Sequence, residues 1–468
     1  MFPIVHEDVS PKDSKTMIFG GINRNELIDD SEWIDNVNVD TLNCPALSPR
    51  KPLRLLKSLN GVMGYLIYEN SIFYILKSSS GNSLYMEIAD EEGKFTTKKI
   101  QDLDASFSPK KYQLMIFNRH LLIFPSCEAF KINYKGDKIH DMVLGLSGYK
   151  KFSKKSGNSS GIDNISYVCE YNNRIFAIDD EDNIKATALG RYDIWTKYTG
   201  VLTDSWATDV ASPGKFTGIN LYRDHITIMK RDVTYELYGT LPSNFSLQEA
   251  FKNGSINNDS IVEVGGRLYF VSASGVNVYG GGVPRAISYK LREKFIDSYC
   301  FTDGLRFYMS LDNGDRKRTY VYDTDLNIWS CYADKYFIYS GDLMYGGKTH
   351  KVVVDDKGNV YEMNSGDEKV EWEAISKRYT DDTFQKKSIR KLKFSCHMDR
   401  GARLSFYVSF DDRPFNLVKA IRNDKDQAFI DVDVYIPLRR AKNVQVRIEG
   451  LGMSKVYGER EMFYRSEK

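Results

Sequence analysis

The sequence lacks long apolar runs and any strong excess of one charge. No uncharged stretch approaches the roughly 18 apolar residues that a membrane-spanning helix needs, and the segment Met1–Thr16 has acids and prolines where a secretory signal would be apolar. Lys and Arg total 65 against 63 for Asp and Glu, so no overall field favours nucleic acid. We therefore expect a soluble protein with neither a membrane nor a nucleic acid as its partner.

Metal and cofactor motifs are missing as well. Neither the six cysteines nor the six histidines show ligand spacing, and there is no GxSxG elbow or phosphate-binding loop. The acidic run Asp179–Asp182 lacks the Gly and Glu positions of a calcium loop and is typical of a hairpin turn. We expect no catalytic residue, no metal and no cofactor, and we predict that the protein is not an enzyme.

What the sequence has in abundance is aromatic residues and alternation. Its 31 Tyr and 25 Phe suit a pleated, half-buried surface. Runs such as 225–229 and 267–271 alternate with period two, and polar turns such as 355–359 separate them. Helical periodicity is found in one stretch, Arg285–Asp297, where apolar residues recur every four positions. The pattern predicts an all-β protein with this stretch as its one candidate helix.

The hairpins recur along the chain. Their second strands begin near Asn70, Glu128, Asn183, Asp232, Gly275, Asn327 and Asn359. The intervals are irregular but centre near the roughly 40–50 residues of a four-stranded propeller blade. Because one hairpin cannot bury both its faces, such units must stack around an axis or against a second sheet. We predict a β-propeller of six or seven blades, with a long array of β-sandwiches as the structural alternative.

The composition changes after Gly366, and cleaner alternation follows from Lys387. Four or more alternating strands over about 80 residues predict a compact β-sandwich. Their apolar faces comprise Leu392, Phe394, Cys396, Leu404, Phe406, Val408, Phe410, Ile430, Val432, Val434, Ile436, Val444, Val446 and Ile448. We divide the chain into an N-terminal arm leading into the first blade (1–58), a β-propeller (59–368) and a C-terminal β-sandwich (369–468).

Ordered motifs run through most of the chain, from Phe19 to about Glu461. They are Phe19–Arg24 (FGGINR), Ile28–Glu32, Asp35–Asn38, Cys44–Arg50, Ile165–Glu170, Asn173–Arg174, Ala188–Trp195, Thr203–Ser205, Tyr235–Gly239, Leu268–Ser272, Gly275–Val276, Tyr320–Thr324 with Trp329, Tyr435–Arg440 and Val446–Gly450. In this order they resemble the β-propeller proteins of bacteriophage tail and neck modules. The design is also similar to the tail-hub or stabilisation proteins of short-tailed phages, which close the head–tail channel and carry fibres.

The resemblance implies a structural virion protein of the tail or neck, an assembly and attachment scaffold without catalytic residues to transfer. It would be synthesised in the host cytoplasm and stand in several copies beside other virion proteins in a symmetric assembly. Trp and Arg are enriched at binding hot spots, so the candidate contact residues are Trp33, Arg50, Arg439 and Arg440. Burial in the core is the alternative for Trp33, and a solvated face is the alternative for Arg439 and Arg440.

Two other functions compete with this one. A carbohydrate- or receptor-binding propeller of a tail fibre or baseplate would carry exposed aromatic residues on one face. A glycoside hydrolase would need two carboxylates converging in a concave pocket.

Overall fold

The computed structural model describes residues 13–26, 28–78, 81–107, 109–136, 138, 140–380, 386, 388–426, 428–436 and 440–463. These residues form 39 β-strands and one 3-10 turn, η1 Asn258–Ser260, with no α-helix among them. This part of the chain therefore has no helix with the length and apolar character of a membrane span. The prediction of an all-β chain is confirmed.

Most of the described strands belong to seven four-stranded antiparallel sheets that follow one another along the chain. Each of the first six uses four consecutive strands. Their bounds are β6 Val62–Tyr68, β7 Ser71–Ser78, β8 Gly81–Ala89 and β9 Phe95–Asp102; β10 Gln113–Phe117, β11 His120–Phe124, β12 Glu128–Tyr134 and β13 Val143–Lys151; β14 Ile165–Tyr171, β15 Arg174–Asp179, β16 Ile184–Ala186 and β17 Trp206–Thr208; β18 Phe216–Tyr222, β19 His225–Lys230, β20 Thr234–Tyr238 and β21 Ser246–Phe251; β22 Ile261–Val264, β23 Arg267–Ser272, β24 Gly275–Tyr279 and β25 Arg285–Ala286; β26 Asp297–Thr302, β27 Phe307–Asp312, β28 Lys317–Asp323 and β29 Ile328–Ala333.

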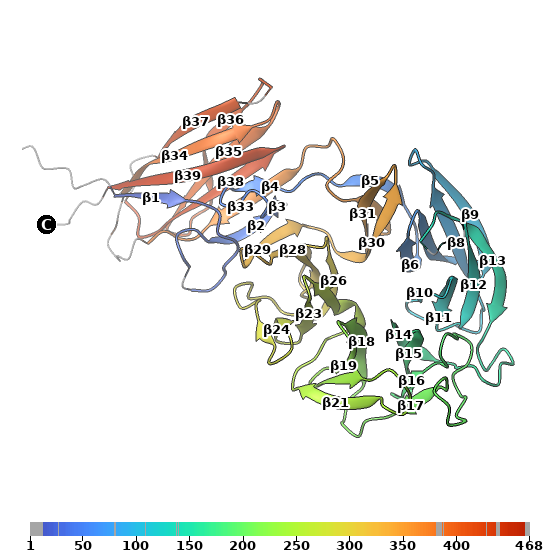
Figure 1. Ribbon diagram of the computed structural model, residues 1–468. Coiled ribbons are helices and arrows are strands. Elements are labelled where there is room, and N and C mark those ends of the chain that lie inside the picture. The colour runs from blue at the N-terminus through green and yellow to red at the C-terminus, as the bar shows by residue number, and fades with distance from the viewer. Residues whose placement is uncertain are drawn as a thin grey trace, which may run out of the picture.

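The seventh sheet draws on two distant parts of the chain. It contains β30 Phe337–Tyr345, β31 Lys348–Asp355 and β32 Asn359–Glu362, and β5 Arg54–Ser58 pairs with β32 at its edge. The first strands of the seven sheets contact one another in order, and β30 contacts β6, so the sheets form a closed ring (Figure 1). The arrangement is β-propeller-like, and β5 joins the end of the ring to its beginning.

Glycine on the first strands lets neighbouring sheets approach closely. A Cβ atom on Gly64 would lie 2.7 Å from Leu114 of the second sheet, and one on Gly341 would lie 2.8 Å from Ile67 of the first. Both distances are shorter than real Cβ contacts, so a side chain at either position would push two sheets apart.

Aspartate side chains shape the hairpin turns. Asp179 Oδ1 accepts hydrogen bonds from the backbone N–H groups of Glu181 at 3.1 Å and Asn183 at 2.9 Å. Asp355 makes the same pair of bonds in the turn 355–359. These are the local bonds by which Asp stabilises a turn, and the prediction that the acidic run after Ile178 is a hairpin turn is confirmed.

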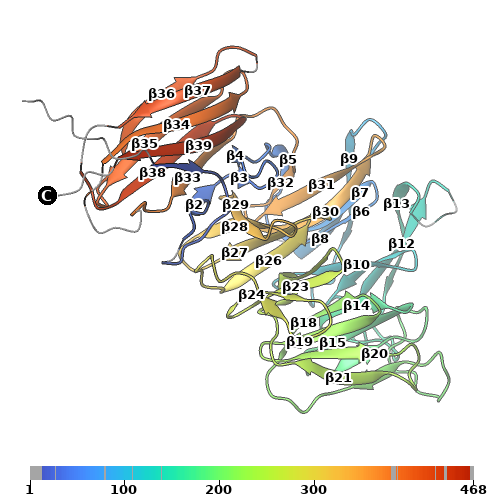
Figure 2. The same ribbon diagram turned by 60° about the vertical axis from the view of Figure 1, so that its left-hand side comes forward.

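Two larger sheets lie beside the ring (Figure 2). One has the strand order β2-β33-β38-β35-β36 and the other the order β1-β39-β34-β37. We call them the C-terminal sheet pair. Their strands are β1 Asp13–Met17, β2 Trp33–Val37, β33 Glu371–Ser376, β34 Ser388–Met398, β35 Arg403–Phe410, β36 Asn416–Arg422, β37 Ala428–Tyr435, β38 Val444–Leu451 and β39 Ser454–Phe463. The short strands β3 Val39–Asp40 and β4 Ser48–Pro49 pair with each other.

The apolar faces predicted from alternation meet in one core between these two sheets. All fourteen predicted side chains belong to it, thirteen of them buried and Ile430 packed against it in part. The core also takes in Trp33, from the beginning of the chain, and Trp372. The indole of Trp372 lies where a Cβ atom on Gly450 would stand, 2.1 Å away, so this glycine makes room for it.

The N-terminal segment pairs with strands from the far end of the chain. β1 pairs with β39 and β2 with β33, at the edges of the C-terminal sheet pair. β5 pairs in the seventh ring sheet, and the first ring sheet begins only at Val62. Three strands of the segment 1–58 thus belong to the two parts of the molecule, although we expected an arm leading into the first blade. The boundaries at 58 and 368 stay predictions, and residues 1–12 lie outside the described residues.

The candidate helix Arg285–Asp297 is wrong. This stretch holds the two-residue strand β25, then turns without regular structure, and ends on the first residue of β26. Ile287 and Leu291 are nonetheless buried in the core of the fifth and sixth sheets, with Phe295 packed against it. Burial of these side chains from an irregular segment gives the same spacing of apolar residues as a helix face, so the periodicity alone was misleading.

Candidate functional site

The N-terminal motif run, residues 19–50, connects the ring to the C-terminal sheet pair. Its β2 pairs with β33, while β2 and β3 both contact β29 of the sixth ring sheet. The backbone N–H of Ile22 donates to the carbonyl of Trp329 at 2.8 Å. Gly21 has a φ of +94°, and a Cβ atom there would lie 2.9 Å from Ile328. The approach of the two chain segments therefore needs glycine at this position.

Largely buried ion pairs hold this joint together. Nη2 of Arg24 lies 2.6 Å from Oδ1 of Asp35, and Nη1 of the same guanidinium contacts Glu293. Nη1 of Arg318 lies 3.1 Å from Oδ2 of Asp35. Burial opposes ionisation of Glu293, but the hydrogen bond from Tyr320 and the charge of Arg24 lower its pKa to about 2. The carboxylate therefore stays charged and binds the motif run to the ring at neutral pH.

Two further polar residues of the motif run have partners in the sixth ring sheet. Asp40 forms a buried ion pair with Arg306 of the sixth sheet. The side-chain oxygen of Asn36 accepts hydrogen bonds from the backbone N–H of Cys331 at 2.8 Å and the hydroxyl of Ser330 at 3.2 Å. These side chains lock one segment against the edge of β29, so their role in the structure is to join two parts of one chain.

The four predicted contact residues have different surroundings. Trp33 is 2% exposed in the core of the C-terminal sheet pair, and its indole N–H donates to the carbonyl of Ile18. Arg50 is 7% exposed, donates to Asn38 and lies over the ring of Tyr332. Arg440 is exposed, and Arg439 lies outside the described residues. A contact with another protein stays a prediction at these positions, although the structure places Trp33 and Arg50 inside the chain itself.

A second group of motif residues fixes the 187–205 loop, which joins β16 to β17 of the third sheet. The side chain of Arg174 is buried and donates to the carbonyls of Thr187, Leu202 and Asp204. The Asp204 carboxylate in turn accepts from the backbone N–H groups of residues 199–201. Both ends of the loop are therefore tied to one guanidinium, and its tip is tied to one carboxylate.

This well-fixed loop presents apolar side chains to solvent. Leu189 is 41% exposed, Val201 is 49% exposed, and Tyr198 and Leu202 are each 59% exposed. Contiguous exposed apolar patches mark surfaces that bind another protein, and these four side chains of one loop are the candidates for such a patch. The sequence shows Arg174 and Asp204 as motif residues, but it does not show that they organise the same loop.

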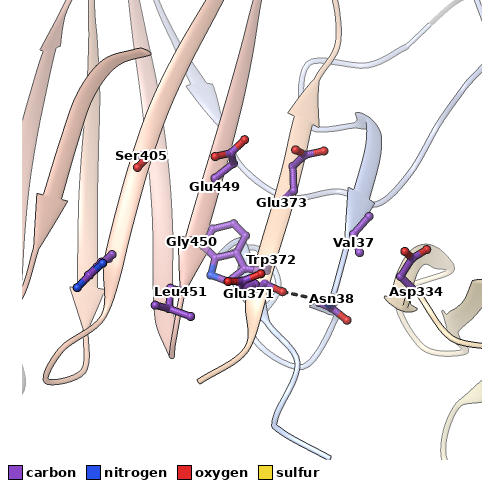
Figure 3. A pocket seen from close by; sticks show the side chains of 11 residues that line it. Val37, Asn38, Asp334, Glu371, Trp372, Glu373, Ser405, Glu449, Gly450 and Leu451 are labelled. Atoms are coloured by element: carbon purple, nitrogen blue, oxygen red, sulfur yellow. Dashed lines mark hydrogen bonds between the residues drawn. The ribbon is translucent and has the colours of Figure 1, made fainter. Parts of the chain in front are cut away.

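An acidic crevice lies between the five-stranded sheet and the ring (Figure 3). Glu373 and Glu449 are cross-strand neighbours. The guanidinium of Arg447 lies 3.8 Å from the Glu373 carboxylate and 3.1 Å from the Glu449 carboxylate. Burial raises the pKa of Glu373, and Arg447 opposes that rise. The cavity volume is about 670 Å³, and its lining comprises Val37, Asn38, Asp334, Glu371, Trp372, Glu373, Arg403, Ser405, Glu449, Gly450 and Leu451.

A second cavity, of about 520 Å³, lies where the first strands of the ring sheets come together, and we call it the axial cavity. Its lining is rich in tyrosine and in side-chain amides. It comprises Tyr65, Pro109, Lys110, Lys111, Tyr112, Gln113, Leu114, Phe124, Pro125, Ile165, Ser166, Tyr167, Asn257, Asn258, Asp259, Tyr299, Tyr339 and Ser340. Six of the seven ring sheets, or the segments leading into them, supply these residues.

One ion pair reaches across the axial cavity. Lys111 precedes the second sheet and Asp259 precedes the fifth, and Lys111 Nζ lies 2.6 Å from Asp259 Oδ2. The same ammonium lies 4.6 Å from the ring centre of Tyr339 and 5.7 Å from that of Tyr299. A glycosidase mechanism with two carboxylates would need a second acid beside Asp259, and the described lining residues supply none.

The cysteines show no sign of a redox or metal role among the described residues. All six are free thiols, and no three His, Cys, Asp or Glu side chains gather there as a metal site would need. Burial raises the pKa of Cys331 and Cys396 to about 12. A thiol that stays protonated is a poor nucleophile and a poor metal ligand.

No protein-family model matches this chain, and no curated protein matches it. Solved structures do. An exo-β-1,3-galactanase from Phanerochaete chrysosporium shares 9% identity over 88% of this chain and 100% of its own, with a TM-score of 0.28. PorZ of the Porphyromonas gingivalis type-IX secretion system shares 12% identity over 81% of this chain and 46% of its own, with a TM-score of 0.41. The Pan2 WD40 domain of Neurospora crassa shares 10% identity over 66% of this chain and 90% of its own, with a TM-score of 0.37.

These similarities concern the propeller-like arrangement of small antiparallel sheets and assign no activity to this chain. They do correct one prediction. We predicted from the sequence that the protein is not an enzyme, and the similarity to a glycoside hydrolase contradicts that prediction. The physical reason is that one scaffold can carry catalytic and non-catalytic sites, so missing motifs do not exclude catalysis.

Proposed function

We propose that the protein is a structural component of a bacteriophage virion, placed in the tail or neck as an assembly and attachment scaffold. In this proposal the seven ring sheets are the blades of a seven-bladed propeller, and the C-terminal sheet pair is a β-sandwich. Several copies would stand beside other virion proteins in a symmetric assembly.

The proposal rests on one observation. The motif residues that resemble those of phage proteins lie at contacts that hold the molecule together. Arg24, Asp35 and Asn36 join the ring to the C-terminal sheet pair, and Arg174 and Asp204 fix the 187–205 loop. Parts of a chain that are joined only by a flexible linker move relative to one another, whereas buried ion pairs and a segment that pairs in both parts resist such motion. A rigid body with an ordered apolar loop suits a scaffold.

The 187–205 loop supports protein contact more strongly than the four residues predicted from the sequence do. Its backbone is already held by Arg174 and Asp204, so association would cost little further conformational entropy of the loop backbone. We therefore propose that Tyr198 and Leu202 contact a neighbouring virion protein.

The test is incorporation of a Tyr198→Ser, Leu202→Ser double variant into phage particles that lack the wild-type chain. The matched control is Val283→Ser with Leu305→Ser, because both side chains are highly exposed and lie elsewhere on the ring. We expect equal thermal stability for the two variants, with the loop variant lost from purified particles in mass spectrometry. Normal incorporation of the loop variant would show that Tyr198 and Leu202 make no contact that incorporation needs. Absence of the wild-type chain from particles would overturn the scaffold proposal itself.

A further inference from the structure

We propose that the axial cavity is a binding site for a neutral oligosaccharide. This inference goes beyond the scaffold role and does not depend on where the protein lies in a virion. It rests on the residue types of the lining, their charge balance and the rigidity of the walls.

The lining has the two kinds of group that sugars need. Tyr167 and Tyr299 are half-buried, so parts of their rings remain accessible and can pack against the C–H face of a pyranose. Ser166 and Ser340 line the same space and offer hydroxyl groups to sugar hydroxyls, whereas the amide N–H groups of Asn257 already donate to Asp297 and Ser298. A cavity of about 520 Å³ falls in the size range of small-molecule sites.

The ion pair of the axial cavity favours a neutral ligand. The lining has three charged side chains, of which Lys111 and Asp259 pair with each other, while Lys110 is exposed to solvent. An anionic sugar would have to compete with Asp259 for the Lys111 ammonium, and a cationic one would have to compete with Lys111 for the carboxylate. Burial raises the pKa of Tyr167 and Tyr299, which keeps both phenols neutral. The phenols therefore bring no charge of their own, and the paired groups can still share hydrogen bonds with a hydroxyl.

The walls are held in place before any ligand arrives. Gln113 of β10 donates to the carbonyl of Val168 on β14 at 2.9 Å and accepts from its N–H at 3.1 Å. Tyr299 of β26 hydrogen-bonds Ser340 of β30 at 3.0 Å. A preorganised site loses little entropy on binding, which is how a shallow polar cavity can hold a sugar.

Two lining side chains also carry buried polar atoms without a hydrogen-bond partner among the described residues. They are the hydroxyl of Tyr65 and Oδ1 of Asn257. Natural interiors rarely leave such groups unpaired. Both atoms are inaccessible in this structure, so a bound hydroxyl would become their partner only after the two side chains move.

The experiment uses the full chain on a glycan array with neutral, acidic and amino-containing oligosaccharides, followed by calorimetric titration of the best binder. The variants are Tyr167→Ala and Lys111→Met, and the control is Tyr289→Ala, a highly exposed tyrosine outside the cavity lining. Thermal unfolding of every variant shows whether it is folded. Lys111 lies partly in solvent, so Lys111→Met tests the site even where Tyr167→Ala fails to fold.

We expect a neutral glycan to bind, both cavity variants to weaken it roughly tenfold or more, and Tyr289→Ala to bind as the wild type does. Three results would overturn the inference: no neutral glycan binds, acidic or amino-containing glycans bind in preference, or the folded cavity variants bind with unchanged affinity. Each of these leaves the test of virion incorporation unaffected.

Discussion

The ring and the C-terminal sheet pair are built from strands of very different sequence separation. Each of the first six ring sheets uses consecutive strands, so its hydrogen bonds join neighbours in the chain. The C-terminal sheet pair instead combines strands from residues 13–37 with strands from residues 371–463. The first kind of sheet can be inferred from local patterns and can form early, since local contacts cost little loop-closure entropy. The second kind requires both chain ends.

This contrast gives the N-terminal segment an importance that its length does not suggest. It completes the seventh ring sheet through β5 and both C-terminal sheets through β1 and β2. Three of the four predictions below test that dependence, and the one on Arg174 tests a local site in the ring for comparison; they begin with the largest expected effect.

Removal of residues 1–58 should abolish cooperative folding of the remaining chain. The deletion exposes the edges of three sheets and removes Trp33 from the core, and exposed sheet edges promote aggregation. Circular dichroism and size-exclusion chromatography of residues 59–468 should show an aggregated or partly folded species. Co-expression with a separate 1–58 chain should restore a soluble complex, whereas a fully stable 59–468 fragment would contradict the account.

Replacement of Arg306 by Ala should destabilise the joint by about 3–5 kcal/mol, because Asp40 would keep a buried charge without its partner. Urea denaturation followed by tryptophan fluorescence measures the change. The matched control is Arg400→Ala, which breaks an exposed pair with Asp426 and should cost less than about 1 kcal/mol. If both substitutions lowered the free energy of unfolding equally, the buried pair of the joint would stabilise the fold no more than an exposed pair does.

Replacement of Arg174 by Ala should loosen the 187–205 loop and leave the ring intact. Three carbonyls lose their donor, and each unsatisfied buried group costs about 1–3 kcal/mol unless it reaches water. Hydrogen exchange should speed up in residues 187–205 and stay unchanged in β26–β29. Arg191→Ala removes a half-exposed arginine, and Asp193 keeps Lys150 as its partner, so exchange in the loop should stay as it is. Uniform exchange changes across the ring would argue against a local role.

A smaller effect should come from acid. The pKa of Glu293 is lowered from 4.5 to about 2 in the folded chain, so its ion pairs stabilise the fold fully above the unfolded pKa and lose that contribution as the pH falls from about 4.5 towards 2. A Glu293→Gln variant should therefore be less stable than the wild type at pH 7 and approach it near pH 2. A stability difference that does not change over this range would contradict the assignment.

Local signals in the sequence predicted the local structure well. Alternation located the strands and the apolar faces of the C-terminal sheet pair, and Asp179 and Asp355 marked hairpin turns. The apolar spacing of Ile287 and Leu291 misled, because tertiary burial produced it in a segment without a helix. Residue type alone likewise suggested that Trp33 forms a contact surface, and nothing local shows that a strand from the far end of the chain covers it.

The candidate sites depend on contacts that no local pattern reveals. Lys111 and Asp259 are 148 residues apart in the chain, and neither lies in a motif that we recognised. Arg174 and Asp204 lie within motifs, yet their partners are backbone carbonyls and N–H groups, which carry no sequence signal. An alignment of related chains could show Lys111 and Asp259 changing together, but a single sequence cannot.

Location in the particle tests the central claim most directly. Purified virions imaged by cryo-electron microscopy should show this chain in several symmetric copies at the neck, tail or baseplate, with the 187–205 loop against a neighbouring protein. A particle map in which every tail and neck protein is assigned and this chain is absent would contradict the scaffold role.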